Sequence, residues 1–160
     1  MRSDPSEPRS TDALFELPCV CQSLRRATRI VTRIYDQELK KAGLEITQFG
    51  LLTALAATSE VNQKRLSEGF VMDSTTLTRT LDRMQKRGWI SVKQGTDKRE
   101  HLLGLTAAGK RQIAKAKPHW EFAEFRLRNE LGEAGWNDLK EAVSLVTKGA
   151  IALQSFLQPQ

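Results

Sequence analysis

Residues 73–105 read DSTTLTRTLDRMQKRGWISVKQGTDKREHLLGL, and the first part of this segment has the pattern of a short amphipathic helix. Asp73 is a residue type that caps helix N-termini, because its carboxylate accepts hydrogen bonds from the free backbone N–H groups of the first turn. Leu77, Leu81 and Met84 follow at spacings of four and three residues, which places them on one helix face. The cations and the glycine that come next predict the end of this helix.

The second part of the segment predicts a β-hairpin. Apolar and polar residues alternate over residues 89–93, a polar turn occupies residues 94–99, and a second strand is expected at 101–105. Upstream, residues 62–69 predict another short helix, which a brief apolar turn separates from the one described above. Two helices at a tight turn, followed by a basic-tipped hairpin, make a winged helix-turn-helix. The expected fold class is therefore mainly α with a small β-hairpin wing.

The helix that follows Asp73 carries hydroxyl groups and arginines on the face opposite its leucines. Short hydroxyl side chains let a helix approach DNA closely, and a guanidinium group matches the O6 and N7 acceptors of guanine. The expected DNA contacts are base edges for Thr75, Thr76 and Arg79, and mainly phosphates for Ser74, Thr78 and Arg83. The alternative is a solvated helix whose serine and threonines only cap its first turn.

The tip of the predicted hairpin carries Asp97, Lys98 and Arg99. A long cation at the tip of a wing can reach into the minor groove, where a narrow width deepens the negative potential. We expect Arg99 to read the minor groove and the Asp97 carboxylate to hold its guanidinium group in one orientation. The alternative is a polar β-turn with incidental charge.

Amphipathic helices are expected on both sides of this segment. Apolar residues recur every three to four positions over residues 20–34, and a second helix is expected to start at Thr47 as its N-cap. Thr106 is the expected N-cap of a long helix, in which Pro118 predicts a kink or a local break. A final helix is expected from about Glu133.

The final helix carries seven apolar residues at strict three-four spacing, the sharpest periodic signal in the chain. Such a stripe is either ordinary intramolecular core or an oligomer interface. We favour a dimer interface, because no later segment is available to cover this helix. The residues expected there are Val20, Leu24, Val31, Trp136, Leu139, Val143, Val146, Leu153 and Leu157. A two-fold dimer places two recognition helices about 34 Å apart and requires a palindromic site.

Composition narrows the function classes. The chain has 160 residues and a formal net charge of +6, and residues 62–106 hold nine Lys or Arg against five Asp or Glu. A basic surplus in one segment suits a polyanion such as DNA. No glycine-rich phosphate loop, metal-ligand cluster or nucleophile beside a base is evident, so we expect no enzymatic activity, metal or cofactor. No stretch is apolar enough to span a membrane and no secretory signal is evident, so a cytoplasmic location is expected.

Two alternative functions stay open. Cys19 and Cys21 lie at the start of the first predicted helix, where the helix dipole can lower a thiol pKa, so an oxidant-sensing regulator is one alternative. The simpler interpretation is two unreactive thiols at the edge of the dimer core. The other alternative is a protein–protein adaptor that uses a winged helix without DNA. An exposed apolar patch in place of the hydroxyl and arginine face would favour it.

The sequence resembles the multiple antibiotic resistance regulator (MarR) family over about residues 20–157. The resemblance rests on residues 73–79, Lys86-Arg87-Gly88-Trp89-Ile90, Asp97-x-Arg99 and Leu105-Thr106-x-x-Gly109. One departure is Gly69, since the family favours a longer helical run before the turn. The resemblance implies a triangular homodimer with intertwined outer helices, a recognition helix in the major groove and Arg99 in the minor groove. Members of the family typically repress genes and are released by small, often phenolic or anionic, effectors.

These observations divide the chain into four parts. A mobile N-terminal tail is expected at residues 1–18, and N-terminal helices for dimerisation and support at 19–58. The winged helix-turn-helix DNA-binding domain is expected at 59–106 and the C-terminal dimerisation helices at 107–160. The expected partners are double-stranded DNA, a second copy of the chain and a small effector. The sequence assigns no residue to effector binding.

Overall fold

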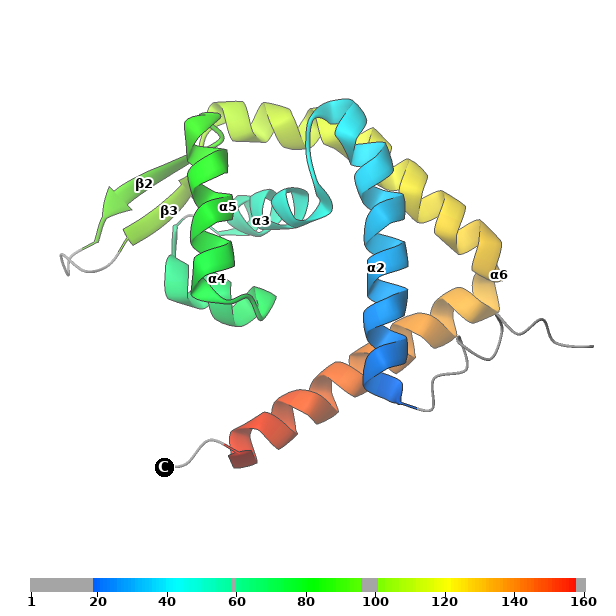
Figure 1. Cartoon of the computed structure of the whole chain (residues 1–160). Coiled ribbons are helices and arrows are strands. Elements are labelled where there is room, and N and C mark those ends of the chain that lie inside the picture. Colours follow the sequence, from blue (N-terminus) through cyan, green and yellow to red (C-terminus); the bar gives the residue numbers. More distant parts are fainter. Residues whose placement is uncertain (1–18, 59, 96–100, 158–160) are drawn as a thin grey trace, which may run out of the picture.

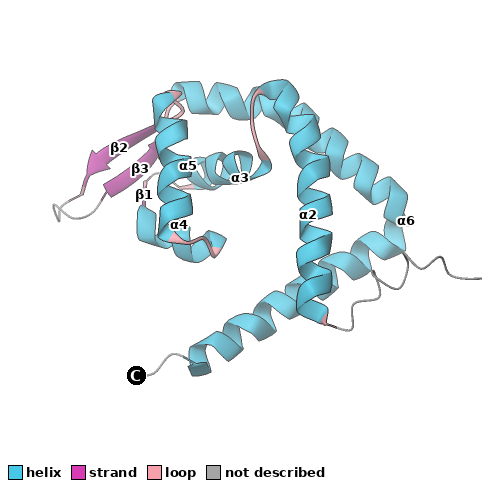
Figure 2. Cartoon of the chain, in the orientation of Figure 1, coloured by secondary structure: helices cyan, strands magenta, loops and turns pink. Residues whose placement is uncertain are grey.

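The computed structural model describes residues 19–58, 60–95 and 101–157, and it confirms a mainly helical chain with one small antiparallel sheet (Figure 1). Helices make up most of the described chain, and the strands gather at one edge, as Figure 2 shows. The helices are α2 (Val20–Leu39), a 3-10 turn (Lys40–Ala42), α3 (Ile46–Ala57), α4 (Gln63–Phe70), α5 (Ser74–Lys86) and α6 (Ala107–Leu157). The strands are β1 (Val61–Asn62), β2 (Ile90–Gln94) and β3 (His101–Leu105). The predicted N-terminal tail, residues 1–18, lies outside the described residues.

Helix α5 forms where the sequence predicts it. The Asp73 carboxylate accepts a hydrogen bond from the backbone N–H of Thr76 at 2.8 Å and so caps the helix. Leu77, Leu81 and Met84 are buried, as their spacing indicates. They join a core whose largest fully buried side chains are Leu39, Leu44, Leu51, Leu52, Leu55, Leu77, Met84 and Leu103. Helix α5 therefore packs against the core through one face, and its opposite face is exposed to solvent.

The sheet contains a third strand that the sequence did not predict. Strand β1 pairs with β3 in antiparallel fashion, with Val61 opposite Leu103, and the strand order is β1-β3-β2. In the predicted hairpin, Ile90 of β2 lies opposite Leu105 of β3. A strand of two residues is too short to show an alternating pattern, so periodicity could not reveal it. Strand β1 also fixes the start of α4, because its last residue, Asn62, is the N-cap of that helix.

The predicted start of α3 is wrong. The helix begins at Ile46, and Glu45 rather than Thr47 is its N-cap. The Glu45 side chain accepts from the backbone N–H of Gln48, and the Gln48 side chain accepts from the N–H of Glu45 at 3.2 Å, which makes a capping box. The Ile46 N–H donates to the Asp36 carboxylate at 2.7 Å. The carboxylates of Glu45 and Asp36 thus accept hydrogen bonds from N–H groups of the first turn, and Thr47 is not the cap.

Helix α6 begins as predicted, because the Thr106 hydroxyl accepts from the backbone N–H of Gly109 at 3.0 Å. Of the two outcomes predicted at Pro118, a kink or a local break, the break does not occur, since helical backbone continues through this residue. A proline in a helix removes one backbone hydrogen bond. Close to Pro118, the Trp120 ring stacks on Phe49 of α3 with centroids 5.8 Å apart, and this packing supports the helix at the point where it lacks a bond.

The break in α6 lies at Gly132, whose φ of 68° and ψ of 169° are outside the helical range. Glycine takes such a left-handed φ without a steric penalty. The Arg128 guanidinium spans the bend and donates to both carboxylate oxygens of Glu133, at 2.7 and 2.6 Å. The predicted start of a final helix at about Glu133 is therefore confirmed, and Figure 1 shows that this last part of α6 runs in a new direction. None of the described helices is long and apolar enough to cross a membrane.

Candidate nucleic-acid interface

The face of α5 that the sequence assigns to DNA is open to solvent. The six α5 side chains expected to contact DNA are all exposed: Ser74, Thr75, Thr76, Thr78, Arg79 and Arg83. On the opposite face, Leu77 and Met84 have no exposed surface. The helix therefore presents hydroxyl and guanidinium groups outward while its leucine face stays packed in the core.

The first turn of α5 has its own hydrogen bonds. Thr76, through its hydroxyl and its backbone N–H, holds the pKa of the Asp73 carboxyl below its usual range. The Thr78 hydroxyl donates to the Ser74 carbonyl at 2.7 Å, and the buried Thr80 hydroxyl donates to the Thr76 carbonyl at 2.9 Å. A hydroxyl has a single hydrogen, so Thr78 can offer a neighbour only its lone pairs in this arrangement.

The arginines of α5 surround a shallow hollow on the same face. It has a volume of about 400 Å³ and is lined by Thr76, Arg79, Asp82, Arg83 and Lys86. Arg83 is oriented by the Thr80 hydroxyl, to which it donates at 3.5 Å. Arg79 has no hydrogen bond or ion pair with any described residue, so its five N–H donors are available for a ligand. This cationic hollow suits the acceptor-rich surface of DNA.

Helix α4 reaches the exposed face of α5 through a side chain that the sequence analysis missed. Gln63 donates from Nε2 to the Thr78 hydroxyl oxygen at 2.7 Å. The turn between the two helices is held by the Ser67 hydroxyl, which donates to the Met72 carbonyl at 2.7 Å, with Val71 at a φ of 49°. Gln63 and Thr78 are 15 positions apart, so neither periodicity nor a capping pattern could have indicated their contact.

The predicted wing-tip residues Asp97, Lys98 and Arg99 lie outside the described residues. The base of the wing is described, and Lys93 of β2 binds the carboxylate of Glu60 with a distance of 2.9 Å between Nζ and Oε1. This hydrogen bond raises the pKa of Lys93. The pair ties the hairpin to the segment that leads into β1.

The C-terminal end of α5 is fixed against the rest of the chain. The Thr106 hydroxyl donates to the Gly88 carbonyl at 2.7 Å. The Arg87 guanidinium lies over the Trp89 ring, 4.9 Å from its centroid, and donates to the Gly43 carbonyl at 2.7 Å. Because these contacts reach α6 and the end of the 3-10 turn, the orientation of α5 is coupled to both flanking helices.

Most of the residues predicted at a dimer interface are exposed in the single chain. Val20, Leu24, Leu139, Val143, Val146 and Leu153 are exposed, with values of 50% for Val143 and 65% for Leu153. Val31 and Trp136 are partly buried, and the side chain of Leu157 lies outside the described residues. Exposed apolar side chains outside the predicted set are Ile30, Phe122, Phe125, Leu131, Leu145 and Ile151.

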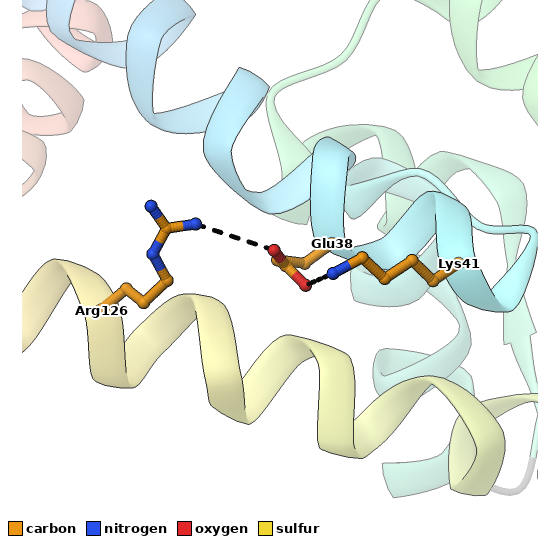
Figure 3. Close-up of polar contacts among 3 residues, drawn as sticks. All are labelled: Glu38, Lys41 and Arg126. Atoms are coloured by element: carbon orange, nitrogen blue, oxygen red, sulfur yellow. Dashed lines mark hydrogen bonds and ion pairs between the residues drawn. The ribbon is translucent and has the colours of Figure 1, made fainter.

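Helix α2 packs against α6 through a polar junction (Figure 3). The buried Glu38 carboxylate lies 2.5 Å from Lys41 Nζ and 3.7 Å from Nη1 of Arg126. Nearby, the Tyr35 hydroxyl donates to the Glu124 carboxylate at 2.8 Å. Burial, and then the hydrogen bond to Glu124, raise the pKa of Tyr35. These contacts join α2 to the first part of α6.

Comparisons with known proteins agree with this geometry. The model of the MarR family matches residues 44–101. The HTH-type transcriptional regulator YwoH of Bacillus subtilis is 30% identical over 83 residues, which cover 52% of this chain and 61% of that protein. The HTH-type transcriptional regulator SarZ of Staphylococcus haemolyticus is 27% identical over 128 residues, which cover 78% of this chain and 87% of that protein.

A solved structure adds a DNA complex. The M. tuberculosis transcriptional regulator MosR in complex with DNA is similar at 30% identity and a TM-score of 0.76, over 84% of this chain and 98% of that chain. The sequence motifs, the winged helix and these relatives lead to one conclusion. The chain belongs to the MarR family of winged-helix, DNA-binding transcriptional regulators.

Proposed function

We propose that the chain binds a palindromic operator as a homodimer and represses transcription until a small effector releases it. The observation that carries this proposal is the exposed face of α5, where hydroxyl groups and arginines lie opposite a buried leucine face. The similarity to MosR in complex with DNA, at 30% identity, supports DNA as the partner.

The proposed contacts follow from the position of each side chain. Thr75, Thr76 and Arg79 read base edges in the major groove, while Ser74 and Arg83 hold phosphates. The wing carries Asp97, Lys98 and Arg99, of which Arg99 enters the minor groove and Asp97 orients it. A role for Thr78 as a phosphate donor does not fit its hydroxyl, whose hydrogen is directed to the Ser74 carbonyl.

A second copy of the chain is the partner we propose for the apolar surface of α2 and the last part of α6. Leu139, Val143 and Val146 share one face of α6 and are 39 to 50% exposed in the single chain. Contiguous apolar patches on a protein surface often mark interaction sites. A two-fold dimer covers them and brings two α5 helices to face one side of the DNA.

The effector we propose is small and phenolic or anionic, on the strength of family resemblance, and we assign it no residue. We assign the chain no enzymatic activity and place it in the cytoplasm. We do not favour the oxidant-sensing alternative over this proposal; the residues it would use, Cys19 and Cys21, are free and exposed thiols. The adaptor alternative is not favoured either, because the exposed face of α5 is polar.

The test is the salt dependence of binding to double-stranded DNA. If the dimer neutralises about eight phosphates, log K should fall against log salt with a slope of about −7. Fluorescence anisotropy of a labelled duplex, titrated at several salt concentrations, measures this slope. Binding that does not change with salt would contradict a DNA-binding function.

A further inference from the structure

Gln63 of α4 contacts the exposed face of α5. Its carboxamide donates to the Thr78 hydroxyl oxygen at 2.7 Å, and the Thr78 hydroxyl in turn donates to the Ser74 carbonyl at 2.7 Å. Thr78 thus receives one hydrogen bond and gives its only hydrogen to the helix backbone. Its role in this arrangement is to hold the Gln63 side chain.

The Gln63 carboxamide keeps hydrogen-bonding capacity after this contact. A glutamine side chain has two N–H donors and one carbonyl acceptor, and Thr78 uses one donor. No described residue uses the second N–H. The half-buried side chain is oriented by Thr78, so an incoming acceptor would find this donor already in place.

Gln63 lines a groove on the surface of the protein. A groove of about 640 Å³ opens beside it between α4, the start of α5 and the start of β3, with Gln63, Ser74 and His101 among its lining residues. In helix-turn-helix proteins the first helix crosses the DNA backbone, while the recognition helix lies in the major groove. Gln63 stands at the first position of α4, next to α5. A phosphodiester, whose oxygens only accept hydrogen bonds, fits the donor that Gln63 offers.

We propose that Gln63 contacts DNA. Thr78 positions the Gln63 carboxamide, and the second N–H of this carboxamide donates to a phosphate oxygen beside each half-site. This assignment rests on the proposed DNA-binding function. It moves a phosphate contact from the hydroxyl of Thr78 in α5 to the carboxamide of Gln63 in α4, and the donor stays neutral.

The experiment measures the affinity of the full chain for two probes, a duplex enriched from a random pool and a random-sequence duplex. Gln63→Ala should weaken binding of both duplexes by a factor of about five per half-site, or about 25-fold for a dimer that fills two half-sites. Because a neutral donor releases no counterion, the salt slope should stay that of the wild type. Gln63→Glu should lose more affinity than Gln63→Ala, since it places a carboxylate beside a phosphate.

The positioning role of Thr78 has its own readout. Thr78→Val keeps the shape of the side chain but removes the hydroxyl, so it should lose about as much affinity as Gln63→Ala. The double variant should lose no more than either single variant, whereas Thr78→Ser should bind like the wild type. Gln37→Ala is the matched control, because it removes an exposed glutamine from α2. Thermal unfolding of each variant separates lost contacts from lost folding.

Three results would overturn the assignment. They are wild-type affinity in Gln63→Ala, a loss confined to the enriched duplex, and additive losses in the double variant. If Gln63→Ala does not fold, Thr78→Val and Thr78→Ser decide the matter in the same way. Absence of wild-type binding to either duplex would overturn the proposed function itself, and with it this assignment.

Discussion

At the residue scale, Arg79 is expected to carry the most sequence information. Its side chain is exposed on the middle of α5 and has no partner among the described residues. Arg79→Ala should weaken binding to the preferred duplex by about 1–3 kcal/mol and relax the preference at one position per half-site. Titration of duplexes that differ at single positions measures both effects.

The matched control is Arg111→Ala, which removes an exposed cation from α6 instead of α5. It should leave the sequence preference intact. If Arg79→Ala loses the same free energy on the preferred duplex and on random DNA, Arg79 contacts phosphate and does not read a base.

Gly109 is a position where the structure leaves no room for a side chain. A Cβ atom placed there would lie 2.2 Å from the Trp89 carbonyl oxygen and 2.6 Å from the Leu105 side chain. Gly109→Ala should therefore lower the free energy of unfolding by about 1–3 kcal/mol, as measured by urea titration. At Gly69, by contrast, no heavy atom lies within 4 Å of the added Cβ.

Gly69→Ala is the control for this effect. Alanine in the interior of a helix is favoured over glycine by about 0.5–1 kcal/mol, so this variant should unfold at slightly higher urea than the wild type. A Gly109→Ala protein as stable as Gly69→Ala would show that the backbones of α6 and the hairpin can separate without cost.

Residue types with a local partner could be predicted from the sequence. The Asp73 cap and the Thr106 cap each join groups three positions apart, and both are confirmed. The Gln63–Thr78 contact and the Glu38–Arg126 pair each join two different helices. Nothing in a single sequence fixes how such helices cross, so these contacts needed the structure.

At the scale of the element, the cap of α5 should make stability depend on pH. Hydrogen bonds from Thr76 lower the pKa of Asp73 in the folded state, so the charged carboxylate stabilises the fold above its ordinary pKa of about 3.9. This contribution is lost as the pH falls through the lowered value. Asp73→Ala should therefore be less stable than the wild type at pH 7, and the difference should shrink below about pH 4.

Asp73→Asn separates charge from capping. An asparagine side chain also accepts hydrogen bonds at an N-cap but does not titrate in this range, so the variant should stay folded at neutral pH without the acid-dependent change. Thermal unfolding of the three proteins across pH 2 to 7 provides the comparison. A constant difference between wild type and Asp73→Ala over this range would contradict the expected role of the carboxylate.

Elements long enough to repeat a periodic pattern could be predicted from the sequence, whereas short or interrupted elements could not. Leucine spacing placed α5, and strand alternation placed β2 and β3, but β1 has only two residues. Thr47 carries a hydroxyl of the type that caps helices, but Glu45, two residues earlier, forms a capping box with Gln48 and starts the helix instead. No break occurs at Pro118, because tertiary packing around Trp120 supports a helix that local propensity disfavours.

At the scale of the whole molecule, the apolar face of the last part of α6 should mediate dimerisation. Leu153 belongs to its three-four stripe and is 65% exposed in the single chain. Leu153→Asp should disrupt the dimer, because burial of an unpaired carboxylate in an apolar interface is costly. Leu145, at 71% exposed, lies off that stripe on the same helix, so Leu145→Asp is the control and should remain dimeric.

Light scattering at micromolar concentration gives the molecular mass of each variant. A folded dimer of Leu153→Asp, or dissociation of Leu145→Asp alone, would move the interface to another face of α6. The molecular mass of the wild type also shows whether the chain forms a dimer in the absence of DNA.

Selection of bound DNA from a random pool is the most direct test of the proposed function. Enrichment of a palindrome requires base contacts by α5, an intact winged domain and a two-fold assembly. The account predicts an enriched palindrome whose half-site centres lie one helical turn, about 34 Å, apart along the duplex. Recovery of a single unpaired half-site would contradict the dimer. Recovery of no preferred sequence, with wild-type protein that is folded, would contradict sequence-specific recognition by the exposed face of α5.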